Sequence, residues 1–83
     1  MQYEYWLKNL GFAIATARKQ RGWSQREASK RCGLHVKFYR DIEYGRRNIS
    51  TRTLFRIVEG LGLPQPYSGV VGFISAEVEN DEQ

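Results

Sequence analysis

Four glycines divide the first three quarters of the chain into segments of helical length. Gly22, Gly33, Gly45 and Gly62 each follow a stretch in which apolar residues recur at three- and four-residue steps, the period of an amphipathic helix. Glycine readily takes the left-handed conformation that ends a helix and turns the chain. The spacing therefore predicts an all-α fold, a compact bundle of four to five short helices.

Apolar faces are most evident in the first and fourth segments. The face of the first predicted helix carries Tyr3, Leu7, Leu10, Ile14 and Ala17, and that of the fourth carries Leu54, Ile57, Val58 and Leu61. Ser50 is a natural N-cap for the fourth helix, which Gly62 and Pro64 end. We expect both faces to be buried in the core.

Capping residues place the second and third helices. Ser24 and Glu27 have capping-box spacing, in which the serine hydroxyl accepts from the Glu27 amide and the glutamate side chain returns to the Ser24 amide. Ala28 and Cys32 should face inward from this second helix. The third helix is predicted over residues 35–44, followed by a basic loop.

The last twenty residues have a mixed pattern. Tyr67, Val71, Ile74 and Val78 fit one face of a helix, whereas residues 70–74 also suit a short strand. We favour a fifth helix. The chain is then one domain over residues 1–79, with its core in 10–63, a candidate dimer contact in 64–79 and a frayed acidic tail in 80–83.

Charge is strongly segregated along the chain. All 13 Lys and Arg residues lie between Lys8 and Arg56, where three acids leave a net charge of +10, and the residues from Ile57 onward carry only acids. A block this basic attracts a polyanion such as nucleic acid. A merely solvated basic face explains the composition equally well.

Other features indicate the compartment. No apolar run approaches the ~20 residues that span a bilayer, and the first residues lack the basic region of a signal peptide. Cys32 is the single cysteine, so it cannot form an intramolecular disulfide, as suits a reducing cytoplasm. We therefore expect a cytoplasmic protein.

A segment of the chain resembles the Cro/repressor-type helix-turn-helix family. It comprises residues 20–63, QRGWSQREASKRCGLHVKFYRDIEYGRRNISTRTLFRIVEGLGL. In that family a glutamine opens the second helix, a glycine makes the turn, and the third helix ends in Ile-Glu-x-Gly. Gln25, Gly33 and residues 42–45 match these features in order. The resemblance covers roughly residues 10–63 and implies a phage-repressor fold whose third helix lies in the major groove of DNA.

The third helix then needs an inward and an outward face. If Tyr39 and Ile42 face inward, a step of about 100° per residue places Lys37, Asp41 and Tyr44 on the opposite face, with Arg40 beside them. The predicted base-reading residues are Val36, Lys37, Arg40 and Asp41.

Each of these four residues has its own chemistry. Lysine donates to guanine O6 and N7, and Val36 can pack on a thymine methyl. Arg40 can reach a guanine or a phosphate. Asp41 can accept from a cytosine amine or hold Arg40 or Lys37 in place. For each of the four, the alternative is a solvated helix face.

A second group is predicted to contact phosphates: Gln25, His35, Tyr44, Arg46, Arg47 and Asn48. Gln25 begins a helix, where free amides favour an anion. His35 either caps the third helix or touches a phosphate, and without partner ligands we assign it no metal. Arg26 and Arg52 are weaker candidates, because either could be an idle surface charge.

The resemblance also implies structural roles. Arg18 and Glu43 correspond to a family ion pair that joins the first helix to the third. Three core positions depart from the family pattern. Tyr39 stands where the family usually has a branched aliphatic residue, and Ala17 and Ala28 stand where it usually has leucine. We therefore expect a compensated core, in which the large ring fills the space that the alanines leave. Trp23 should also lie in the core.

These observations predict a sequence-specific, double-stranded-DNA-binding transcriptional regulator, most simply a repressor that binds an inverted repeat as a homodimer. Within the family, the chain resembles restriction–modification controllers and is equally compatible with plasmid or phage repressors. The resemblance therefore implies a bacterial, phage or plasmid origin. The alternative is an antitoxin or protein-interaction module whose C-terminal segment binds a partner. We predict no enzyme activity, cofactor, metal or membrane association, since Cys32 and His35 have no evident catalytic neighbours.

Overall fold

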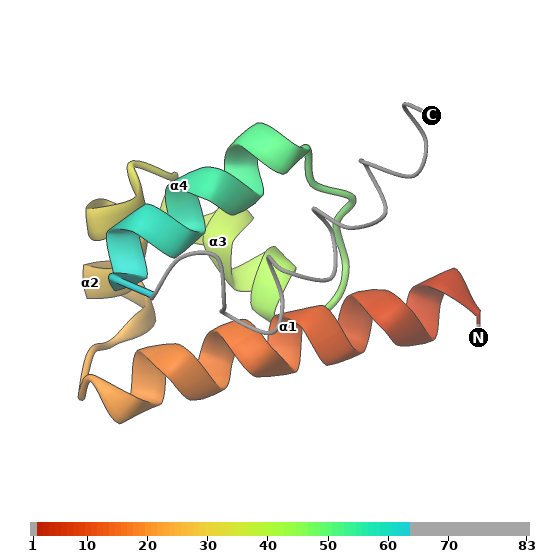
Figure 1. Cartoon of the computed structure of the whole chain (residues 1–83), viewed down its shortest axis with the longest axis horizontal. Coiled ribbons are helices and arrows are strands. Elements are labelled where there is room, and N and C mark those ends of the chain that lie inside the picture. Colours follow the sequence, from red (N-terminus) through yellow and green to blue (C-terminus); the bar gives the residue numbers. More distant parts are fainter. Residues whose placement is uncertain (1, 64–83) are drawn as a thin grey trace.

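The computed structural model describes residues 2–63, which form four helices and no strand. They are α1 (Tyr3–Gln20), α2 (Gln25–Cys32), α3 (Val36–Glu43) and α4 (Thr51–Leu61). In Figure 1, α1 runs along one side of the molecule, and the other three helices lie against one flank of it. The all-α prediction is confirmed for these residues, while the expected fifth helix lies outside them.

The core forms where the four apolar faces meet. α1 packs against α3 and α4, and α2 packs against α3 and α4. The buried cluster contains Leu10, Ile14, Ala17, Ala28, Cys32, Tyr39, Ile42, Leu54, Ile57 and Leu61. Burial of apolar surface is the dominant favourable term in folding, so this cluster supplies the main stabilisation of the fold.

The ends of the short helices follow the capping chemistry of the sequence. The Ser24 hydroxyl accepts from the Glu27 amide, and the Ser50 hydroxyl accepts from the Thr53 amide. Gly33 ends α2 with a φ of 68°, in the left-handed region. Each serine satisfies one amide at its helix N-terminus, where four have no intrahelical acceptor.

Two expectations about side chains are wrong. Tyr3, expected on the buried face of the first helix, is 53% exposed, because that face reaches the core only from Leu7 onward. The Glu27 carboxylate does not complete the capping box. It accepts instead from Arg31 Nε at 2.9 Å, one helical turn along α2, a pairing that i,i+4 spacing favours.

α1 approaches the end of α3 very closely at Gly11. A Cβ atom at this position would meet the carbonyl oxygen of Glu43 and would lie 2.5 Å from that of Ile42. Both neighbours are backbone atoms, so a larger residue would force the helices apart. The absence of a side chain at Gly11 therefore fixes how α3 is seated on α1.

Candidate nucleic-acid interface

The third helix has the two faces that its sequence predicts. Tyr39 and Ile42 are buried, with 0% and 2% exposure, whereas Lys37 and Arg40 are exposed. Val36 is partly exposed at the start of the helix. The outward face therefore presents a small apolar group beside two long cationic side chains.

Asp41 is more enclosed than a position on the outward face implies. Its side chain is 19% exposed and lies between two cations, 3.9 Å from Lys37 Nζ and 3.8 Å from Arg47 Nε. Of the two cations it was expected to hold, Asp41 meets Lys37. The added partner is Arg47, brought across from the α3–α4 loop.

Arg40 is held by a different residue. Its Nε donates to Gln25 Oε1 at 3.2 Å, while Gln25 Nε2 donates to Glu43 Oε1 at 2.9 Å. Gln25 Nε2 also lies 3.5 Å from the Tyr44 hydroxyl. The first residue of α2 thus joins the exposed Arg40 to the buried end of α3, a contact that the sequence pattern did not reveal.

His35 caps the third helix, one of its two expected roles. Its Nδ1 accepts from the Lys37 amide at 3.2 Å. The imidazole satisfies an amide that begins the helix. The cap fixes the backbone on which Lys37 is mounted.

The loop that follows α3 is exposed and basic. Arg46, Arg47 and Asn48 are all exposed. The Arg46 guanidinium lies 5.0 Å from the centre of the Tyr44 ring, and that of Arg47 lies 5.1 Å from the centre of the Phe38 ring. Such cation–π contacts orient the guanidinium groups while leaving their N–H donors available.

The base of the site is the ion pair predicted between Arg18 and Glu43. Arg18 Nε donates to Glu43 Oε2 at 2.7 Å and Nη2 donates to Oε1 at 3.1 Å. Arg18 Nη1 also donates to the Trp23 carbonyl oxygen at 2.8 Å. One guanidinium therefore connects α1 both to α3 and to the chain just before α2.

This pairing controls the charge state of the buried carboxyl. Burial by itself would raise the pKa of Glu43, but hydrogen bonds from Arg18 and Gln25 outweigh it and lower the pKa below its usual value. The same hydrogen bond raises the pKa of Arg18. Both groups are charged at neutral pH, so the Glu43 charge is compensated near the interface.

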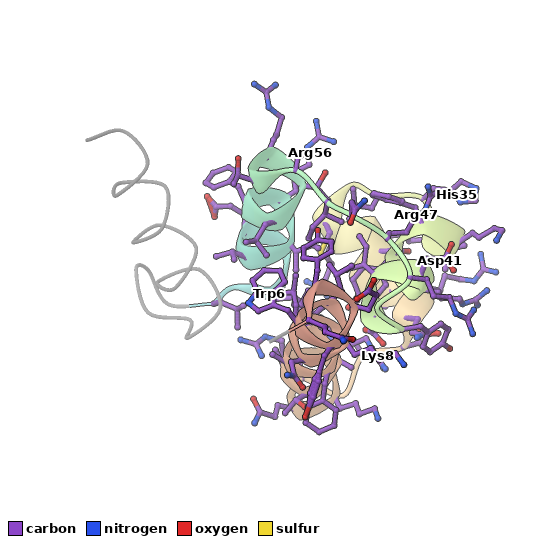
Figure 2. The ribbon with its side chains drawn as sticks, turned by 90° about the vertical axis from the view of Figure 1, so that its right-hand side faces the viewer. Trp6, Lys8, His35, Asp41, Arg47 and Arg56 are labelled. Atoms are coloured by element: carbon purple, nitrogen blue, oxygen red, sulfur yellow. The ribbon has the colours of Figure 1, made fainter. Side chains whose placement is uncertain are left out.

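Figure 2 shows His35, Asp41 and Arg47 on one side of the molecule. The predicted base-reading and phosphate residues thus fall on α3, on its flanking loop and on the first residue of α2.

No group of three or more His, Cys, Asp or Glu residues within residues 2–63 could hold a metal ion. Among residues 2–63, none of the helices combines the length and the apolar character of a membrane-spanning segment.

Comparisons with known proteins agree with the helix-turn-helix fold. Residues 14–64 match the helix-turn-helix family. The chain is 32% identical over 56 residues to an uncharacterised HTH-type transcriptional regulator of Sinorhizobium fredii, y4dJ, covering 68% of this chain and 73% of that protein. The fold is similar to a crystal structure of a tyrosine-to-phenylalanine mutant of the restriction–modification controller protein C.Esp1396I, with a TM-score of 0.69 and 23% identity over 93% of this chain and 91% of the other.

The protein belongs to the helix-turn-helix family of DNA-binding transcriptional regulators. The resemblance noted in residues 20–63 is therefore confirmed, and α2 and α3 are its helix-turn-helix pair.

Proposed function

We propose that this protein regulates transcription by reading a specific DNA sequence through the outward face of α3. The observation that carries the proposal is the construction of this face. The side chain of Lys37 is 79% exposed. His35 accepts from the Lys37 backbone amide, and the Asp41 carboxylate lies 3.9 Å from the Lys37 ammonium group. An exposed lysine at the start of a helix that fits the major groove suits donation to a guanine edge.

The surrounding residues provide for contacts with the phosphates. Arg46, Arg47 and Asn48 extend from the loop after α3, and Gln25, His35 and Tyr44 lie at helix ends. Contacts of this kind fix the register of a protein on the duplex without reading sequence. Val36, Arg40 and Asp41 complete the base-reading set beside Lys37.

We further propose a homodimer on an inverted repeat, acting as a repressor. A single helix-turn-helix unit buries little surface on DNA, and two units about one helical turn apart gain from being joined. The similarity in fold to a restriction–modification controller is compatible with this arrangement. Repression follows when the occupied site overlaps a promoter.

Selection from random duplex DNA tests the proposal. Duplexes that the full chain retains are sequenced, and its binding to the selected site is compared with binding to one half-site. An inverted repeat, occupied by two chains and bound cooperatively, supports the proposal. An asymmetric site occupied by one chain contradicts the dimer, and the absence of any selected motif contradicts sequence-specific reading.

A further inference from the structure

A shallow hollow lies between α1 and the ends of the helix-turn-helix pair. Its α1 wall carries Lys8, Phe12 and Lys19, and Gln25 and Tyr44 line the opposite wall. Gln25 and Tyr44 belong to the proposed phosphate-contacting set. The hollow therefore continues the proposed DNA surface from α2 and α3 onto the outer face of α1.

Lys8 is fixed close to the basic loop by a tight backbone contact. A Cβ atom at Gly45 would lie 2.8 Å from the Cα atom of Lys8, and Gly45 holds a φ of 73° in the left-handed region. The chain immediately before Arg46 and Arg47 thus rests on α1 at Lys8. In Figure 2, Lys8 lies below Asp41, while Arg56 is far from it at the top of the molecule.

The charges in the hollow leave both lysines available. Arg18 and Glu43, which also line it, neutralise one another through their two-point ion pair. Neither Lys8 nor Lys19 forms an ion pair with another residue in the described range 2–63. By contrast, Arg31, Lys37 and Arg47 each face a carboxylate.

The two lysines lie on one stripe of α1. Lys8, Phe12 and Lys19 are separated by four and seven residues, so they share one face of a helix with a period of about 3.6. Their separation of eleven residues is about 16 Å along the axis at 1.5 Å per residue. Two side chains mounted this far apart on one helix can reach different phosphates.

We propose that Lys8 and Lys19 bind the phosphates of the DNA strand that passes over Gln25 and Tyr44, so that α1 lengthens the footprint beyond the helix-turn-helix pair. The inference rests on the proposed function. Phe12, which lies between the two lysines and is 72% exposed, offers apolar surface to the deoxyribose of the same strand. The α1 stripe contributes affinity that depends on salt but not on base sequence.

The test measures binding to two probes over a range of salt concentrations. The probes are a duplex selected from random DNA by the wild-type chain and a scrambled duplex of the same length. The variants are Lys8→Gln, Lys19→Gln and their combination, because glutamine keeps much of the aliphatic stem that packs beside the backbone. Thermal melts establish that each variant is folded.

Matched controls remove the same charge elsewhere. Lys30 and Arg56 line a different hollow, between α2 and α4, and both are exposed. Lys30→Gln matches the single variants, and Lys30→Gln with Arg56→Gln matches the double variant. The controls therefore report the effect of net charge alone.

A phosphate contact changes the salt dependence in a defined way. The logarithm of the binding constant falls with the logarithm of the salt concentration, and each lost contact makes this fall less steep by about 0.9. The advantage of wild type over a single variant then shrinks by about 3.5-fold between about 50 and 200 mM salt. We expect this change on both probes and not in the controls. In the Lys8→Gln, Lys19→Gln variant the change in slope should double, so that the factor becomes about 12-fold.

Two results overturn the inference. One is a slope change no larger than in the matched controls. The other is a loss confined to the selected duplex, which would mean base reading by α1. The proposed function fails separately, if the wild-type chain selects no motif, and the scrambled duplex still measures the two lysines in that case.

Discussion

The Arg18 guanidinium and the Glu43 carboxylate meet at two points, with N–O distances of 2.7 and 3.1 Å, and join α1 to the end of α3. Their side chains are only 11% and 2% exposed. Gln25 donates to the Glu43 carboxylate of this pair and accepts from Arg40 at the surface. The orientation of α3 therefore depends on a contact with α1.

Removing one partner of this pair should destabilise the protein strongly. Arg18→Met leaves the Glu43 carboxylate buried without its main partner, which typically costs about 3–5 kcal/mol. The double variant Arg18→Met, Glu43→Leu removes both charges and should lose less than the two single variants together. Urea unfolding of the four proteins measures this double-mutant cycle, and additive losses would show that the pair is not coupled.

The same carboxyl should make stability depend on pH. Its pKa is lowered in the folded protein from an ordinary value of 4.5, so the folded state binds fewer protons than the unfolded state. This contribution is fully present above pH 4.5 and is lost as the pH falls through the folded pKa. Urea unfolding between about pH 6 and pH 3 measures the loss.

Glu43→Gln is the control for that titration. The variant lacks the carboxyl, so its stability should fall less steeply with acid than that of the wild type. The comparison uses the two pH slopes rather than absolute stabilities, because the substitution also weakens the Arg18 contact. Equal slopes would assign the acid sensitivity to other carboxyl groups.

The contact at Gly11 gives a further prediction. Gly11→Ala places a Cβ atom against the backbone carbonyls of Ile42 and Glu43, so the helices must shift. Overpacking of this kind typically costs about 1–3 kcal/mol, although alanine is by itself the better helix former. Asn9→Ala, at an exposed site of α1, provides the control in thermal melts. A Gly11→Ala protein as stable as that control would refute the close approach.

The compensated core remains a prediction. Tyr39 and Ala28 are both 0% exposed within the same buried cluster, and Ala17 lies there too. Ala28→Leu should overpack this cluster and Tyr39→Ile should leave a void, so the double variant should be milder than the sum of the singles. Thermal melts of the three variants decide the matter, and simple additivity would rule out compensation.

Local chemistry explains why so much of the fold could be predicted from the sequence. Ser24 and Ser50 cap helices because a serine hydroxyl can accept from a free amide at a helix N-terminus, and Gly33 ends a helix because glycine takes the left-handed conformation without strain. The inward position of Tyr39 follows in the same way from helical periodicity. The burial expected at Tyr3 is wrong because periodicity does not show where a neighbouring helix ends.

Side-chain contacts between different elements could be predicted only where the family resemblance implied them, as it did for Arg18 and Glu43. Gln25 meets Arg40 and Glu43, and Asp41 meets Arg47, through side chains whose sequence separation carries no periodic signal. Lys8 reaches the surface of the site for a similar reason, since its position beside Gly45 depends on how α1 crosses α3. Trp23, which was expected in the core, is partly buried and packs against the core cluster, and the Arg31 guanidinium lies 4.1 Å from the centre of its ring.

Base reading by α3 through Lys37 can be tested with the variant Lys37→Ala. Its binding to the selected duplex and to a scrambled duplex is compared with that of wild type, and Lys30→Ala serves as the charge-matched control. We expect a loss of about 1–3 kcal/mol on the selected duplex, with a loss on scrambled DNA no larger than that of the control. An equal loss on both duplexes would contradict base reading, because Lys37 would then contact only the phosphates.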